Sequence, residues 1–363
     1  MFAADIETPA LIVDLDVMER NLGRAADYAR THGLRLRPHT KTHKTPELGR
    51  LQLEYGAAGL TVAKVGEAEV MVESGTPDLL VHYPVIGGSK LERLMQVARR
   101  TRVTVALDSV LAARQLSEAA RAAQVEVGVL AETDVGLGRV GVTPGAELVD
   151  LARSICALPA LSFEGITCYP GHIKDLEGAG RKQIETLASV TRGMLDDFRR
   201  AGIAVKIVSG GSTPALYHSH EVAGLNEIRP GTYIYNDLNT VRSGGCTLAD
   251  CAAAVLATVV STARPHQMII DGGSKTFSSD GALGGEGTFG RIVEAPEARF
   301  VRMNEEHGYV DISGAKRGFA VGDRVRVIPN HICVVSNLHE RAYGLRGDQV
   351  EKVWTIAGRG KLQ

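Results

Sequence analysis

Residues 103–124 read VTVALDSVLAARQLSEAARAAQ, and this stretch contains one complete strand–helix unit. The apolar, β-branched run VTVAL predicts a buried strand, and Asp-Ser predicts a turn at its end. The apolar residues that follow recur at helical spacing. A buried strand followed directly by an amphipathic helix is typical of an α/β protein with a parallel sheet.

The same alternation continues in both directions along the chain. Towards the N-terminus it covers residues 10–33, 34–56, 59–75 and 78–100, and towards the C-terminus it covers 125–158, 161–201 and 204–235. About eight such units predict an α/β fold of the (β/α)8 TIM-barrel type. An open doubly wound sheet is the alternative. No GxGxxG follows the first strand, which favours the barrel over a dinucleotide-binding sheet.

The pattern changes after Asp237. Residues 251–274, 298–313, 321–340 and 349–360 alternate between apolar and polar positions, with Gly, Asp and Asn between the runs. Alternation with a period of two, broken by turn residues, predicts antiparallel strands. We therefore expect a C-terminal antiparallel β-domain after the barrel.

Composition narrows the classes of function. The 363 residues carry a net charge of -1, with 44% apolar and 23% charged residues, so nothing favours a nucleic-acid or membrane partner. The N-terminus MFAADIETPALIVDLD has acids where a secretory signal has lysines. Five cysteines without a CxxC pair indicate reduced thiols rather than a disulfide framework. We expect a cytoplasmic enzyme that acts on a small molecule.

Reactive groups follow the predicted barrel strands, where the active sites of barrels lie. Lys41 comes after the predicted strand LRLRPH, and Arg139 comes after the predicted strand VLAET. GGST (210–213) lies at the end of the predicted strand KIVSGG. Taken singly, a lysine there is usually a solvated loop residue, and Gly-Gly-Ser-Thr is usually only a turn. Small residues also let backbone N–H groups approach a phosphate. A lysine, an arginine and a phosphate seat together favour pyridoxal 5'-phosphate, which needs an amine, a phosphate site and groups that tune its ring.

Several motifs in the chain resemble a known family. PALIVDLDVMERNL (9–22), LRPHTKTHK (36–44) and DVGLGRVGV (134–142) are similar to fold-type III pyridoxal phosphate enzymes, to which alanine racemase belongs. GGSTP, RPGTYIYND, EEHG and PNHIC follow in the order found in the D-threonine aldolase and D-serine dehydratase family. The resemblance implies a pyridoxal phosphate barrel over residues 15–240 and a β-domain of residues 1–14 plus 241–363. It also implies a homodimer.

The resemblance assigns roles to individual residues. Lys41 matches the lysine that forms the Schiff base with the cofactor and removes the Cα proton, and its rival Lys44 stands at another position of the motif. His39, with Arg37 and Lys44, is expected to hold Lys41 or to lower its pKa through positive charge. The other residues implied at the cofactor are Arg139 at the ring 3-oxygen, Tyr169 as an active-site aromatic, Gly211, Ser212 and Thr213 at the phosphate, and Gly231 and Tyr235 near it.

PNHIC supplies the candidate metal ligands. In a β-strand, residues i and i+2 face the same side, so His331 and Cys333 could bind one metal ion. A buried thiol beside a histidine is more often simple packing. The resemblance places the metal here: aldolases carry H-x-D, which suits manganese or magnesium, whereas D-serine dehydratases carry H-x-C, which suits zinc. His331 is also a candidate catalytic base, as is His172.

Two reactions on a D-3-hydroxy amino acid remain open. Loss of the Cα proton and the β-hydroxyl gives a 2-oxo acid and ammonia, whereas cleavage of Cα–Cβ gives glycine and an aldehyde. H-x-C favours the dehydratase, and Tyr169 favours the aldolase. An amino-acid racemase or a non-catalytic cofactor carrier is more remote: the β-domain offers no racemase-like tyrosine motif, and carriers are single-domain barrels. We favour a lyase of the dehydratase type.

Overall fold

The computed structural model describes residues 1–176, 178–285 and 287–363. The chain divides into two compact units. The first comprises residues 1–22, 42–44 and 232–359, and the second comprises residues 23–41, 45–231 and 360–363. The long helix α1 (Leu15–Thr31) begins in the first unit and ends in the second.

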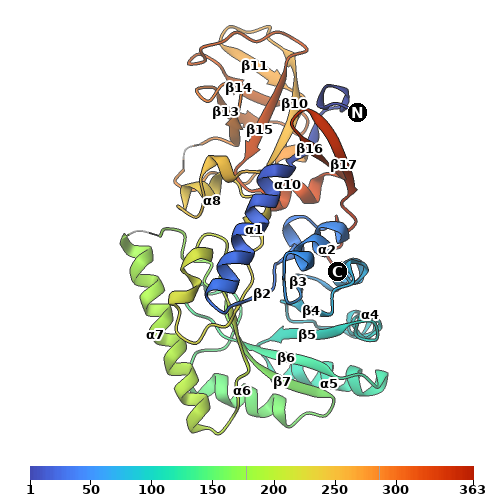
Figure 1. Ribbon diagram of the computed structural model, residues 1–363, viewed down its shortest axis with the longest axis vertical. Coiled ribbons are helices and arrows are strands. Elements are labelled where there is room, and N and C mark those ends of the chain that lie inside the picture. The colour runs from blue at the N-terminus through green and yellow to red at the C-terminus, as the bar shows by residue number, and fades with distance from the viewer. Residues whose placement is uncertain (177, 286) are drawn as a thin grey trace. The chain divides into compact units, whose positions relative to one another are not determined.

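The second unit is a barrel of eight parallel strands. Its strand order is β2-β9-β8-β7-β6-β5-β4-β3, and a parallel bridge between His39 and Thr61 joins the two ends of the series. Figure 1 shows β5, β6 and β7 side by side, as their pairing requires. The strands are β2 (Arg35–Leu36), β3 (Leu60–Val62), β4 (Asp78–Val81), β5 (Arg102–Leu107), β6 (Val127–Glu132), β7 (Leu161–Thr167), β8 (Ile207–Gly210) and β9 (Glu227–Ile228).

The sequence of these strands explains their position. Every residue of β3, β4, β6 and β8 is buried, as expected for parallel strands that are covered on both faces. Neighbouring helices pack against one another in chain order. They are α2 (Pro46–Glu54), α3 (Val65–Met71), α4 (Gly88–Ala98), α5 (Val110–Ala123), α6 (Ala146–Cys156) and α7 (Gly178–Arg200). The (β/α)8 prediction is confirmed.

The first unit is built on a nine-stranded sheet of order β11-β14-β13-β12-β15-β10-β1-β16-β17. The N-terminal strand β1 pairs antiparallel with β10 and parallel with β16. The strands are β1 (Ala10–Asp14), β10 (Ala253–Ser261), β11 (Gln267–Ile270), β12 (Gly290–Ile292), β13 (Arg299–Met303), β14 (Gly308–Asp311), β15 (Arg324–Pro329), β16 (Arg341–Arg346) and β17 (Gln349–Thr355). The short helices are α8 (Leu238–Arg242), α9 (Ser274–Phe277) and α10 (Ile332–Leu338).

Two local predictions are wrong. The strand expected to carry Lys41 ends at Leu36, and Lys41 lies in a 3-10 turn, η2 (Thr40–Thr42). The strand expected through PNHIC ends at Pro329, and His331 is instead the residue that precedes helix α10. In both places proline lies at or just beyond the strand end, where its missing N–H cannot extend a sheet ladder.

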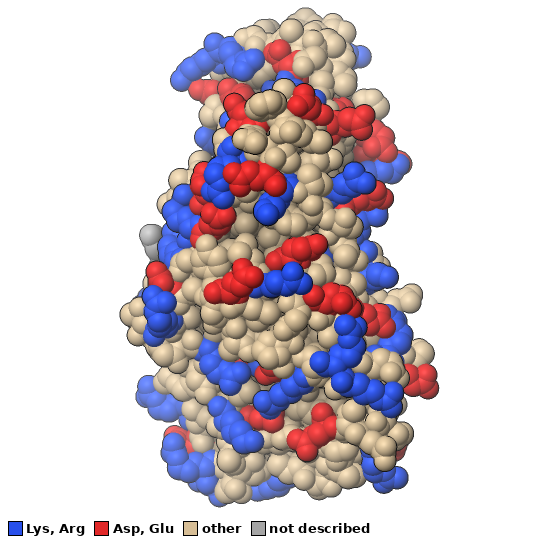
Figure 2. All heavy atoms as spheres, turned by 45° about the vertical axis from the view of Figure 1, so that its right-hand side comes forward, with Lys and Arg blue, Asp and Glu red and all other residues tan. Residues whose placement is uncertain are grey.

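The surface agrees with the near-neutral composition. On the face shown in Figure 2, lysine and arginine side chains are interspersed with aspartate and glutamate. None of the helices in the described ranges combines the length and the apolar character needed to span a bilayer.

Candidate active site

Lys41 lies in the turn η2, which follows strand β2 of the barrel. Its side chain is half-buried, and its backbone N–H donates to Nδ1 of His39 at 3.3 Å. His39 is 8% exposed and bridges to Thr61 on β3. The short turn η2 therefore fixes the backbone from which the Lys41 amine extends.

Arg37 forms buried ion pairs. Its guanidinium is 1% exposed and donates to both carboxylate oxygens of Asp78, at 2.9 and 2.8 Å, and to Oε2 of Glu227 at 2.9 Å. Burial lowers the pKa of Arg37, but the bonds and charges of the two carboxylates outweigh it and raise that pKa. Arg37 is therefore paired with two buried carboxylates, and its expected effect on Lys41 stays a hypothesis.

One aromatic ring faces two cations. Nζ of Lys41 lies 5.9 Å from the centroid of the Tyr169 ring, and Cζ of Arg139 lies 4.8 Å from it. Cations within about 6 Å of an aromatic face are attracted by the ring quadrupole. The structure therefore brings together three of the predicted site residues.

The loop that carries Arg139 is held by Asp134. Its Oδ1 accepts from the N–H groups of Gly136, Leu137 and Gly138 at 3.0–3.1 Å. Burial raises the pKa of Asp134, but these bonds outweigh it and lower the pKa. Asp134 was not among the predicted site residues, although an aspartate before a glycine-rich stretch is a known turn signal.

Residues 211–213 form a concave backbone turn after β8. Gly211 has φ +85°, a conformation that L side chains rarely adopt, and all three residues are buried. Within the described chain, no hydrogen bond occupies the N–H groups of these three residues. Thr213 Oγ1 accepts from Gly231 N at 3.2 Å. Buried N–H groups without acceptors are costly, so this turn is suited to an anion such as a phosphate.

The barrel interior contains a polar network that was not predicted from the sequence. Arg229 donates to Ser209 Oγ and to the Cys168 carbonyl at 3.0 Å, and its Nη2 lies 3.0 Å from Nε2 of His82. Burial, and then the charge of Arg229, hold the pKa of His82 well below its usual range, so this imidazole is neutral. Arg229 and His82 lie just beyond β9 and β4, as the barrel rule places functional groups.

Glu132, the last residue of β6, belongs to the same interior. Its Oε1 lies 3.7 Å from His82 Nε2, and its Oε2 has no hydrogen-bond partner among the described residues. Burial raises its pKa to about 6. Among the described residues, Nδ1 of His172 is also buried without a partner. The barrel therefore holds polar atoms that its own described side chains do not satisfy.

The candidate metal ligands meet in the first unit. His331 precedes α10, and Cys333 is the second residue of that helix. The charge of Cys333, the hydrogen bonds to Asp237 and Cys333, and the charge of Asp237 outweigh burial and raise the pKa of His331 to about 11. Cys333 Sγ lies 3.2 Å from Oγ1 of Thr42 and 3.7 Å from Oγ1 of Thr232.

Asp237 fixes the imidazole. Nδ1 of His331 lies 3.0 Å from Oδ2 of Asp237, a distance at which Nδ1–H donates to the carboxylate and Nε2 is left for a metal. Tyr235, predicted near the phosphate, is buried in the first unit with its backbone carbonyl bonded to Ala252 N at 2.6 Å. Burial raises the pKa of its hydroxyl.

Models of two known domain families match this chain. The model of the alanine racemase N-terminal domain matches residues 13–239, and a serine dehydratase domain model matches residues 252–345. The chain belongs to the D-threonine aldolase and D-serine dehydratase family of fold-type III pyridoxal phosphate enzymes. It is a pyridoxal phosphate-dependent lyase.

Individual relatives cover nearly the whole chain. A 3-hydroxy-D-aspartate aldolase of Paracoccus denitrificans is 34% identical over 99% of this chain and 94% of its own length. The crystal structure of D-threonine aldolase from Filomicrobium marinum matches with a TM-score of 0.93 and 32% identity, covering 99% of this chain and 98% of its own. D-threo-3-hydroxyaspartate dehydratase from Delftia has a TM-score of 0.89 and 28% identity, covering 98% of both chains.

The described residues fit the family's cofactor. Lys41 offers an amine beside an aromatic ring, Arg139 a guanidinium, and residues 211–213 buried N–H groups without acceptors. The unsatisfied oxygen of Glu132 and nitrogen of His172 mark polar positions inside the same unit. These groups would supply the amine, the phosphate seat and the ring partners that pyridoxal phosphate requires.

The metal pair fits a soft divalent ion. A thiolate and an imidazole suit zinc better than manganese or magnesium. No cluster of three or more His, Cys, Asp or Glu side chains suited to a metal occurs in the described ranges. His331 and Cys333 would thus form a two-residue set that leaves other metal positions for water and ligands.

Proposed function

We propose that this protein is a divalent-metal-dependent dehydratase of D-3-hydroxy amino acids such as D-serine and D-threonine, giving a 2-oxo acid and ammonia. The observation that carries this proposal is the His331–Cys333 pair with its imidazole held by Asp237. Solved structures of a D-threo-3-hydroxyaspartate dehydratase include alanine variants of a histidine and of a cysteine two positions further on, the latter in a metal-free form. The same spacing separates His331 and Cys333.

The barrel residues would carry the first half of the chemistry. Bound pyridoxal phosphate supplies an electron sink for negative charge at Cα. Lys41 would hold the cofactor, and its amine, once released by the substrate, would take the Cα proton. Arg139 would donate to the cofactor ring, and the N–H groups of residues 211–213 would bind its phosphate. Tyr169 orders both cations, since its ring faces Lys41 and Arg139.

The metal ligands would carry the second half. A bound divalent metal supplies Lewis acidity toward a hydroxyl group. His331 would bind through Nε2 while Nδ1–H remains on Asp237, and Cys333 would bind as the thiolate. Zinc is the metal that this donor pair favours, with manganese or magnesium as alternatives.

Product analysis tests the proposal. We would incubate the zinc- and cofactor-loaded protein with D-threonine and separate the products chromatographically. Release of 2-oxobutanoate with equal ammonia supports dehydration. A Lys41→Ala variant, which lacks the reactive amine, should release neither. Glycine and acetaldehyde from the wild-type protein would contradict the dehydratase proposal.

A retro-aldol reaction is the second candidate. Tyr169 favours it. Among relatives that cover nearly the whole chain, two aldolases are 34% and 31% identical, whereas two dehydratases are 29% and 26% identical. A Cys333→Asp variant converts H-x-C to the H-x-D of aldolases, and it should be assayed with manganese on the same substrate. If the ligand sets the outcome, the share of glycine rises in this variant. An unchanged product ratio would assign the outcome to the barrel residues instead.

We also propose a cytoplasmic homodimer: the family resemblance suggests the dimer, and five reduced cysteines suggest the compartment. Light scattering after size-exclusion chromatography tests the oligomer, since a monomeric mass would contradict it.

A further inference from the structure

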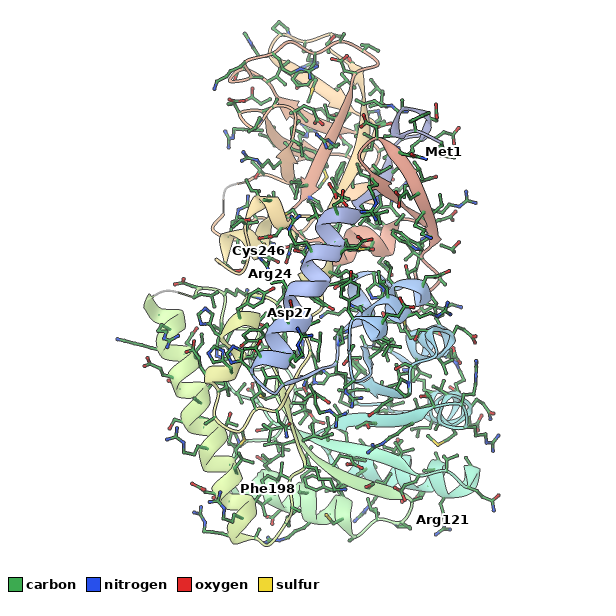
Figure 3. All side chains as sticks on the ribbon, viewed as in Figure 1. Met1, Arg24, Asp27, Arg121, Phe198 and Cys246 are labelled. Atoms are coloured by element: carbon green, nitrogen blue, oxygen red, sulfur yellow. The ribbon has the colours of Figure 1, made fainter. Side chains whose placement is uncertain are left out.

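Two cysteines outside the proposed site lie next to one another. Cys246 follows helix α8, at the position labelled in Figure 3, and Cys251 precedes strand β10. Both are half-buried and reduced, and Sγ of Cys251 lies 4.0 Å from the carbonyl oxygen of Thr247, the residue that follows Cys246. Nothing in the proposed mechanism uses either residue.

The backbone between them is a tight, closed turn. The N–H and Oγ1 of Thr247 both donate to Oδ2 of Asp250, at 2.8 and 2.9 Å. Asp250 N donates to the Thr247 carbonyl at 3.0 Å, and Cys251 N donates to the Leu248 carbonyl at 3.2 Å. These bonds fold the segment back on itself, so Cys251 returns to the start of the turn that Cys246 precedes.

The base of the turn is anchored to the rest of its unit. The carbonyl of Asp250 accepts from Nδ2 of Asn21 at 2.8 Å and from Nδ2 of Asn236 at 3.1 Å. Ala252 N donates to the Tyr235 carbonyl at 2.6 Å. These bonds fix the backbone on the Cys251 side of the turn.

We propose that Cys246 and Cys251 form a reversible intrachain disulfide when the protein meets a low-molecular-weight disulfide. The Cys251 thiolate attacks that reagent and releases one thiol, which leaves a mixed disulfide on Cys251. Cys246 then loses its proton to water and attacks the Cys251 sulfur, which releases the second thiol. The protein loses two electrons and two protons, and the reagent is reduced to two thiols.

The surroundings set the order of attack. The hydrogen bond to Cys251, then burial and the carboxylates of Asp250 and Asp237, raise the pKa of Cys246. Cys246 therefore keeps its proton, so Cys251 is the sulfur expected to attack the reagent first. Once Cys251 is in a mixed disulfide, its sulfur lies beside the thiol that resolves it.

Other cysteines serve as internal comparisons. Cys168 is buried in the barrel, and burial raises its pKa to about 11, so it should stay reduced. Cys156 is exposed at the end of α6. Cys156 should accept a small thiol as a mixed disulfide rather than form an internal bond.

Mass spectrometry tests the proposal directly. The cofactor-loaded protein would be equilibrated in oxidised and reduced glutathione at several ratios, blocked with an alkylating reagent and digested with trypsin without reduction. Trypsin does not cleave between Arg264 and Pro265, so the peptide that follows Arg242 is 243–275, and it contains Cys246, Cys251 and no other cysteine. We expect this peptide to lose two hydrogens as the ratio rises and to regain them in excess reduced glutathione.

A matched variant separates an internal bond from simple reactivity. In Cys246→Ser, Cys251 should instead retain glutathione, because no resolving thiol is present. The proposal is overturned if the wild-type peptide remains a dithiol while Cys156 is modified, or if it carries glutathione without losing two hydrogens. Both readouts are masses of wild-type peptides, so they do not depend on the variant folding or on catalytic activity.

Discussion

Nδ1 of His331 lies 3.0 Å from Oδ2 of Asp237, and this contact ties a candidate metal ligand to the start of a helix. Oδ1 of Asp237 accepts from Thr240 N at 2.8 Å and caps helix α8, while Oδ2 also accepts from Ile332 N at 3.1 Å in the first turn of α10. One buried carboxylate therefore sets the imidazole orientation and caps a helix. The chain separates the two partners by more than ninety residues.

Asp237→Asn should weaken zinc binding more than it weakens folding. The amide retains an oxygen acceptor for helix capping but loses the charge that orients and activates the imidazole. Loss of a side chain that hydrogen-bonds a metal ligand typically costs about 10–100-fold in metal affinity. Competition with a fluorescent chelator measures the change. Asp250→Asn, which alters another capping carboxylate without contact to His331, is the control. Equal zinc affinities of the two variants would show that Asp237 does not support the metal site.

The sequence could predict the barrel because each strand–helix unit is local. Buried strands such as β6 and amphipathic helices such as α5 carry their patterns within a few turns of chain. The same reasoning failed for ICVVSNL, where β-branched valines favour a strand but the chain forms α10. A contact from Asp237, far away in sequence, satisfies the first N–H of that helix.

The sequence predicted only those site residues that stand in recognisable motifs. Lys41, Arg139 and Tyr169 were chosen singly, and the structure brings them together. The pairing of Arg37 with Asp78 and Glu227 could not be predicted, since it joins three different strand regions. The same holds for the contact between His82 and Arg229, which are 147 residues apart. Such interior contacts depend on tertiary packing rather than on local sequence.

Lys41→Ala should abolish attachment of the cofactor, whereas Lys44→Met should retain it. Lys44 is buried with Nζ 3.4 Å from the carbonyl of Gly358, so its amine is already engaged. Borohydride reduction of the wild-type holoenzyme, followed by peptide mass analysis, should place the cofactor on Lys41. A label on Lys44, or a persistent visible Schiff-base band in Lys41→Ala, would reverse the assignment.

Arg37→Met should destabilise the barrel severely, by about 3–5 kcal/mol, because it leaves two buried carboxylates without their cation. Arg35→Met, two residues earlier in the chain, is the matched control. Arg35 is 45% exposed and lies 4.0 and 3.6 Å from the same two carboxylates, so its loss should cost no more than about 1 kcal/mol. Urea unfolding of the two variants measures the difference. Similar losses would mean that burial of the pair matters less than its charge.

His339 should make stability fall between pH 6.5 and pH 4. Nε2 of His339 donates to the Thr276 carbonyl at 3.3 Å, and burial lowers the pKa of the imidazole to about 4. Above pH 6.5 the group is neutral in both the folded and unfolded chains. Below that pH the unfolded chain binds a proton that the folded chain excludes, so the free energy of unfolding declines as pH falls.

His339→Gln should remove this part of the pH dependence, since glutamine does not ionise and its amide can donate to Thr276. At pH 5 the wild-type protein should have lost about 2 kcal/mol relative to pH 7 that the variant retains. His307→Gln, at an exposed position, should follow the wild-type curve. Denaturant unfolding at pH 7, 6 and 5 gives all three curves, and differences between them cancel the other titrating groups. Parallel wild-type and His339→Gln curves would show that this imidazole accepts a proton in the folded chain.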